Sequence, residues 1–294
     1  MTKFSNWITG GKSLATMFAV IATIMASSIA LDLSANAAET RQAVPDFASY
    51  WGRPEPAAAA ARFYPPDSGP GPVTFAPDLG EMRRGMPMIG DDTNRILLPH
   101  AAAALQAQRA QYATGDIVWS AWALCWPTGV PLAFNMTNAV QFLQSEDQIT
   151  IVYQRGQTVR RVDLNQAHPQ NPEPSWFGHS VGHYEGTSTL VIDTIAQDTR
   201  STIDRFGTPK SDAMRIVERY TISTDRQSLD VEFNVEDPKT FTTAWSATFR
   251  YVRLPPGSGD EPQEPIFAEI ICPENNRDPQ GGGFAIPIAA SPSF

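Results

Sequence analysis

The second half of the chain alternates apolar and polar residues with a period of two, which is typical of strands with one buried face. Residues 228–236 show it most clearly, with an apolar residue at every odd position from Leu229 to Val235. Turn signals separate nine such runs: 139–144, 149–154, 158–164, 179–185, 189–195, 214–223, 228–236, 243–252 and 266–271. This spacing predicts a mostly β fold, a single antiparallel up-and-down β-barrel of eight or nine strands, with a β-sandwich as the alternative.

The segments before these runs predict less regular structure. Seven prolines lie between Pro54 and Pro77 among scattered aromatics, so we expect an irregular N-terminal arm docked on the core by its rings. Pro99 to Tyr112 predicts one peripheral helix, because proline suits a first helical position and Gly115 follows. The expected organisation is a signal peptide at 1–37, the arm at 38–97, helix and connection at 98–137, the barrel at 138–278 and a flexible tail at 279–294.

The N-terminus has the pattern of a secretory signal peptide. Lys3 and Lys12 precede an apolar run at 14–33, and Ala35 and Ala37 form a small-x-small cleavage site. A retained membrane anchor is the alternative, since the run is long enough to span a bilayer. We expect a periplasmic or secreted protein without stable membrane insertion after signal removal. A net charge of −9 without basic clusters argues against nucleic acid as a partner.

Two cysteines, Cys125 and Cys272, are present. Disulfides persist in exported proteins, so the two could form a bridge. Two free buried thiols are the alternative. A cysteine-based metal site is not expected, because neither cysteine has a second Cys or a His nearby in the sequence.

The stretch 175–195 concentrates the candidate chemistry. If 179–185 is extended, His179, His183 and Glu185 share one face of a strand. His179 and His183 would then lie about 13 Å apart on a straight strand, too far to share an ion, so no metal is expected.

Acid–base chemistry suits these residues better, because histidine titrates near neutrality. His179 is the candidate proton shuttle, with Asp193 or Glu185 as its partner. A two-residue turn after Glu185 would set Ser180 opposite Asp193 and point His179 to the other face, and one extra residue would reverse this. A hydrogen-bonded structural histidine near the rim is the alternative.

Residues 178–182 formally match the G-x-S-x-G nucleophile elbow. That motif needs a strand-to-helix turn above a parallel sheet, and here strand-like residues follow. A serine hydrolase acting through Ser180 is therefore a weaker alternative.

Several polar residues lie mid-strand among apolar neighbours, where interior groups need partners. We expect an Arg161–Glu218 pair inside a pocket, with a solvated outer face as the alternative. The candidate substrate-binding residues are Tyr153, Arg161, Trp176, His183, Glu218 and Tyr220.

Motifs along most of the chain resemble a family of uncharacterised exported bacterial proteins. They are Pro45-Asp46-Phe47, Trp51-Gly52-Arg53, Cys125 with Pro127 to Pro131, Gly178 to Gly182, Leu190 to Thr194, and Cys272 with Glu274-Asn275-Asn276-Arg277-Asp278. The resemblance implies a calycin- or lipocalin-like barrel, supports pairing of the two cysteines and implies no activity. The sequence departs from the family at His183 and Tyr184, and its turn at 186–188 is one residue longer.

Together these features predict an exported enzyme that applies acid–base chemistry to a hydrophobic or aromatic small molecule in a barrel pocket, as a lyase, isomerase or hydratase. No cofactor is expected, because the sequence has no nucleotide-binding glycine loop and no clear haem or iron–sulfur motif. The alternative is a periplasmic binding or carrier protein with the same pocket and no catalysis. The oligomeric state is not predicted.

Overall fold

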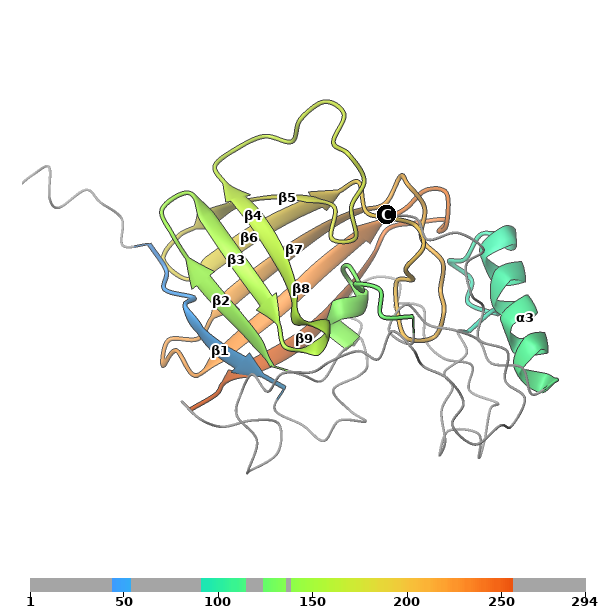
Figure 1. Cartoon of the computed structure of the whole chain (residues 1–294), viewed down its shortest axis with the longest axis horizontal. Helices are drawn as coiled ribbons and strands as arrows, with labels where there is room; N and C mark the ends of the chain where they lie inside the picture. The colour runs from blue at the N-terminus through green and yellow to red at the C-terminus, as the bar shows by residue number, and fades with distance from the viewer. Residues whose placement is uncertain (1–43, 54–90, 115–123, 136–138, 256–294) are drawn as a thin grey trace, which may run out of the picture. The chain divides into compact units, whose positions relative to one another are not determined.

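The computed structural model describes residues 44–53, 91–114, 124–135 and 139–255. Every described residue except Val44 belongs to one compact unit that begins at Pro45. Nine strands close into a barrel in chain order (Figure 1). They are β1 (Ser49–Gly52), β2 (Val140–Gln144), β3 (Gln148–Tyr153), β4 (Thr158–Leu164), β5 (His179–Glu185), β6 (Thr189–Ile195), β7 (Arg215–Ile222), β8 (Ser228–Glu236) and β9 (Trp245–Arg253). The predicted mostly β, single-barrel fold is confirmed.

One pair of strands departs from the predicted up-and-down topology. β4 and β5 run parallel, from Val162 opposite Ser180 to Leu164 opposite Gly182. The reason is the connection 165–178, which carries the chain back along the outside of the barrel before β5 begins (Figure 1). Parallel neighbours need a long crossover of this kind, whereas the connections of three to eight residues between β2 and β3, β3 and β4, β5 and β6, β7 and β8, and β8 and β9 join antiparallel pairs.

The strand that closes the barrel comes from the segment predicted to be an irregular arm. β1 pairs with β2 through Trp51 opposite Val140, and with β9 through Trp51 opposite Arg253. Trp51 and Phe47 are completely buried, and the Trp51 Nε1–H donates to the Phe47 carbonyl at 3.0 Å. Within the described residues 44–53 of this segment, Phe47 and Trp51 dock on the core and the chain also adds a strand. The strand predicted at 266–271 lies outside the described residues.

Helix α3 spans Pro99–Ala113, in agreement with the predicted peripheral helix. Ala101 and Leu105 are buried, and most of the other described side chains of the helix are exposed. Two backbone hydrogen bonds tie the residues around its start to the β8–β9 connection: Leu98 N–H to the Thr240 carbonyl at 2.9 Å, and Thr242 N–H to the Ile96 carbonyl at 2.8 Å. Within the described part of the chain, no helix is long and apolar enough to cross a bilayer.

The inward-facing side chains form one hydrophobic core. The short 3₁₀ helix η2 (Leu132–Asn135) is fully buried, and its Phe134 ring packs on Phe233 at 5.2 Å and on Phe249 at 4.9 Å. Long connections gather where β5 begins and β6 ends. Ser175 bridges to Gln197, and Val130 N–H donates to the Gln197 side chain at 3.0 Å. We call this the loop end of the barrel, formed by residues 124–135, 171–178 and 196–214.

Candidate functional site

The turn between β5 and β6 decides which candidate residues meet. Glu185 pairs with Thr189, which leaves three turn residues, 186–188, and sets Ser180 opposite Thr194. The longer of the two turns considered is therefore present. His179 and Asp193 share the outer face of the barrel, and Ser180 points inward and is buried. A buried Ser180 within a continuous strand does not have the geometry of a nucleophile elbow.

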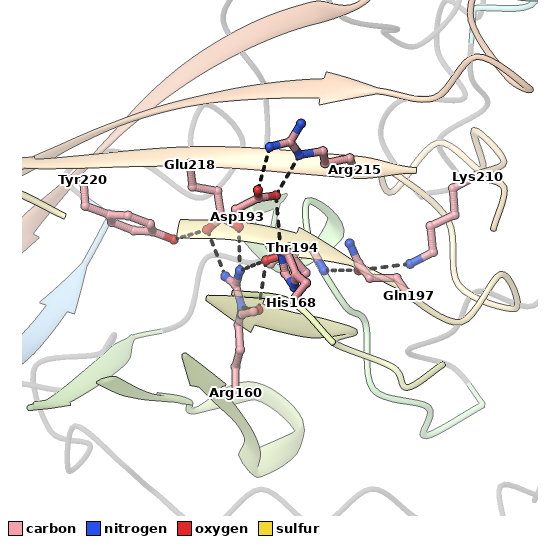
Figure 2. Close-up of polar contacts among 11 residues, drawn as sticks. Arg160, His168, Asp193, Thr194, Gln197, Lys210, Arg215, Glu218 and Tyr220 are labelled. Atoms are coloured by element: carbon pink, nitrogen blue, oxygen red, sulfur yellow. Dashed lines mark hydrogen bonds and ion pairs between the residues drawn. The ribbon is translucent and has the colours of Figure 1, made fainter. Parts of the chain in front are cut away.

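On the outer face, His179 meets a second histidine. His168, from the 165–178 connection, places its Nδ1 2.9 Å from the Nδ1 of His179. The other nitrogen of His168, Nε2, lies 3.7 Å from the Asp193 carboxylate. Asp193 in turn accepts two hydrogen bonds from Arg215, at 2.9 and 2.7 Å (Figure 2). His179 and Asp193 are thus connected through His168, which sequence reasoning did not single out.

This arrangement fixes the protonation of the two rings relative to each other. An Nδ1 to Nδ1 contact of 2.9 Å requires one nitrogen to donate and the other to accept, so both rings cannot be charged at once. Burial lowers the pKa of His168, an effect that Asp193 partly opposes. The Nε2 of His179 faces outward, 3.9 Å from the Asp163 carboxylate. Both rings are therefore partly exposed, and His168 is the less exposed of the two, at 16% against 29% for His179.

Glu185 and His183 lie at the other end of β5. Glu185 forms an ion pair with Arg219, and its carboxylate is 3.4 Å from His183 Nε2. All three side chains are exposed. Six residues separate Glu185 from His179 along the strand, about 20 Å at the usual rise. The structure therefore does not bring Glu185 to His179, and of the two predicted partners only Asp193 lies in the same cluster.

Inside the barrel, Glu218 pairs with Arg160 rather than with the predicted Arg161. Arg160 Nη1 and Nη2 donate to the two carboxylate oxygens at 2.9 and 2.6 Å, and both residues are almost completely buried. Arg161 lies opposite Thr150 in the register of β3 and β4, and its side chain is exposed on the outer face. The error is one residue of register. Arg160 shares a face with the apolar Val162 and Leu164, and this alternation is the sequence signal that would have identified Arg160 instead of Arg161.

Hydroxyl groups satisfy the rest of this ion pair. Arg160 Nε donates to Ser180 at 3.1 Å and Nη2 donates to Thr194 at 2.6 Å, while the Tyr220 hydroxyl donates to Glu218 at 2.7 Å. Burial works against the charge of Arg160, but Glu218 holds the pKa of Arg160 above its ordinary value. Burial also raises the pKa of Tyr153 to about 12, so this phenol stays neutral. The predicted Glu218, Tyr220 and Tyr153 are thus interior residues of a neutralised polar cluster.

Two half-buried residues, Trp126 and Trp176, form an aromatic surface at the loop end, which we call the tryptophan shelf. The rings of Trp126 and Trp176 lie 5.4 Å apart, and the Arg200 guanidinium sits 4.4 Å from the centre of the Trp176 ring. Next to this shelf in sequence, Phe177 stacks on Tyr153 at 5.2 Å. Trp176 is therefore a surface residue of the loop end that also packs against the core.

The sequence analysis also considered metal ligands and a disulfide bond. Among the described residues, no group of three His, Cys, Asp or Glu side chains is arranged to hold a metal ion. Cys272 lies outside the described residues, so its disulfide with Cys125 stays a prediction.

Comparisons with known proteins add little. No protein-family model matches the sequence, and no curated protein matches it. Among solved structures, it is similar to the crystal structure of a luciferase domain from the dinoflagellate Lingulodinium polyedrum, with 12% sequence identity and a TM-score of 0.24. That match covers 78% of this chain and 62% of the other.

Proposed function

We propose that the protein is an exported enzyme that performs acid–base chemistry on a small hydrophobic or aromatic molecule at the loop end of its barrel. His179 is the proton shuttle, His168 is its relay, and Asp193 with Arg215 positions the relay. The observation that supports this is the 2.9 Å contact between the two Nδ1 atoms, with His168 Nε2 turned toward Asp193. A histidine oriented by a second acid–base group is the usual arrangement of a general base.

The proton path follows from the tautomers. With the His168 Nε2–H directed at Asp193, the Nδ1 of His168 accepts the Nδ1–H of His179. This leaves the Nε2 lone pair of His179 free to remove a proton from a substrate C–H or O–H. The imidazolium formed can pass its Nδ1 proton to His168, and the Asp193 carboxylate then faces the charge at 3.7 Å.

The reaction class follows from where the proton goes next. Return to a different substrate atom gives an isomerase, and delivery to a leaving oxygen gives a lyase or hydratase. None of these steps requires a cofactor. The Asp163 carboxylate lies 3.9 Å from His179 Nε2, on the side of the ring that faces the substrate.

The expected substrate is hydrophobic or aromatic because of the neighbouring side chains. Trp176 lies three residues before His179, and its ring pairs with Trp126. Flat, half-exposed indole rings favour stacking with aromatic ligands. Arg200, over Trp176, is ion-paired with Asp198 at 2.6 Å and adds a charged pair at the edge of this surface.

A binding or carrier protein without catalysis is the second candidate. The observation in its favour is the closed barrel, an architecture of the kind that can hold one small ligand. In that case the His179–His168 contact only fastens the 165–178 connection to β5. An exported location is common to both proposals and rests on the signal-like N-terminus.

Proton exchange tests the proposal without knowledge of the reaction. The protein is incubated in D₂O with a panel of small aromatic carbonyl and hydroxy acids, and mass spectrometry follows deuterium at the acidic carbons. We expect exchange into at least one compound, and a loss of about 10²–10⁴-fold in His179→Asn, the usual contribution of a general base. His100→Asn, which changes an exposed histidine of α3, is the matched control.

Exchange that is as fast in His179→Asn as in the unaltered protein would refute the assignment of the base. Saturable binding of a compound without any exchange would favour the carrier.

A further inference from the structure

Lys210 at the loop end is a buried lysine without an ion-pair partner among the described residues. Its side chain is 5% exposed, and its Nζ makes one hydrogen bond, to the Oε1 of Gln197 at 3.3 Å (Figure 2). The two nearest carboxylates are engaged elsewhere. Asp198 is bound by Arg200, and Asp237 accepts hydrogen bonds from Ser211 and Thr240. Lysine is almost never fully buried unless it is paired, so this amine requires an explanation.

Gln197 places a second unused donor beside it. Its Oε1 accepts from both Val130 N–H and Lys210 Nζ, which fixes the orientation of the amide, because a flip would set donor against donor. The amide Nε2 is therefore directed away from these groups. It is buried and has no hydrogen-bond acceptor within the described ranges. The amide Nε2 thus lacks an acceptor, and the ammonium has one acceptor for its three N–H groups.

Gly129 forms one wall around these donors. Its φ is +68°, and a Cβ added there would lie 2.7 Å from the Gln197 Oε1 and 3.2 Å from the Lys210 Nζ. The same Cβ would lie 2.4 Å from the Trp176 carbonyl oxygen. The backbone at Gly129 and the Trp176 carbonyl therefore lie against the side chains of Gln197 and Lys210.

We propose that Lys210 and Gln197 form a binding subsite for the carboxylate of a small aromatic acid. A carboxylate accepts several hydrogen bonds and carries one negative charge, which matches one ammonium and one amide. A doubly charged phosphate fits less well, because Asp198 and Asp237 lie close to the same amine. The adjacent indole rings suit the aromatic part. Burial lowers the pKa of Lys210 to about 8, an effect that Asp198 and Asp237 partly oppose, and most of the amine is therefore charged at pH 7.

This subsite does not depend on the proposed proton chemistry of His179. It assigns a ligand class to groups that the proton relay does not use, and it would serve a carrier equally well. Gln197 lies two residues after the end of β6, the strand that carries Asp193, so the two sites are neighbours along the chain.

The test is NMR of the lysine amines with ¹⁵N-labelled lysine. The chain has only four lysines, Lys3, Lys12, Lys210 and Lys239. Lys239 is exposed and ion-paired with Asp212 at 2.6 Å, which makes it the matched control. Benzoate is the probe, and benzamide is its uncharged isostere. We expect a saturable shift of the Lys210 signal with benzoate, no such shift at Lys239, and binding of benzamide at least about tenfold weaker.

Variants then assign the donors. Lys210→Met and Gln197→Leu should each weaken benzoate binding about tenfold or more, whereas Lys239→Met should leave it unchanged. Thermal unfolding checks that each variant is folded, and the shift in the unaltered protein does not depend on any variant. Equal binding of benzamide would overturn the proposal, since charge would not be recognised. An unchanged Lys210 signal would also overturn it, and would leave buried water as the partner of these donors.

Discussion

Glu218→Gln should lower the free energy of unfolding by about 3–5 kcal/mol, because it leaves the buried guanidinium of Arg160 without a counter-charge. Arg160 and Glu218 have side chains that are 1% and 0% exposed and share two hydrogen bonds. A glutamine amide can accept from only one of the two nitrogens, and its own NH₂ then opposes the other. The free energy of unfolding of a single domain is about 5–15 kcal/mol, so this one substitution removes a large part of the total stability.

Urea denaturation followed by tryptophan fluorescence measures the loss, and thermal melting should show a midpoint lower by roughly 6–20 °C. The double variant Arg160→Met with Glu218→Leu should recover part of the lost stability, because it removes both charges together and leaves Ser180 and Thr194 bonded to each other, while the Tyr220 hydroxyl loses its acceptor. Arg250→Gln, which breaks an exposed pair with Asp230, is the control and should have a much smaller effect. A double variant less stable than Glu218→Gln would refute this reasoning.

Three further predictions concern the loops and the titrating groups. Gly178→Ala should lower the free energy of unfolding by about 2–4 kcal/mol in chemical denaturation, because the φ of Gly178 is +68° and an added Cβ would lie 2.2 Å from a backbone oxygen. Gly186→Ala should lower it by only about 1–2 kcal/mol, because Gly186 has a similar φ of +60° but nothing lies within 4 Å of the added Cβ. Equal losses would contradict the backbone clash at Gly178. Burial lowers the pKa of His168, so the unfolded chain binds more protons than the folded chain, and stability should fall as the pH drops below about 6.5. Melting temperatures measured from pH 7 to 5 test this, and His168→Gln should show a weaker decrease of melting temperature over that range. Burial raises the pKa of Asp204 to about 6, so this carboxyl keeps its proton in the folded state, and stability should fall as the pH rises from about 4 to 6. If Asp204→Asn shows the same fall in stability over this range, another group causes it.

The position of the interior ion pair shows how far sequence patterns reach. Alternation placed Glu218 and Tyr220 on the buried face of their strand, and the structure agrees. The same rule applied to β4 identifies Arg160, since Val162 and Leu164 are apolar, but two consecutive arginines made the choice ambiguous. His179 was predicted as a site residue, yet its facing depended on whether the turn had two or three residues. His168 lies in an irregular connection, where no period relates it to β5.

The sequence by itself determined that this chain is mostly β, where most of its strands lie and which faces the clearly alternating strands bury, while a barrel and a sandwich both remained consistent with it. The physical reason is local: a strand with one buried face must alternate, and Leu229 to Val235 can satisfy that requirement in only one register. Only the tertiary structure decided that Ser49–Gly52 closes the barrel, that β5 runs parallel to β4, and that His168, Lys210 and Gln197 meet their partners. These contacts join segments far apart in the chain, and their free energy comes from burial and pairing that no local pattern encodes.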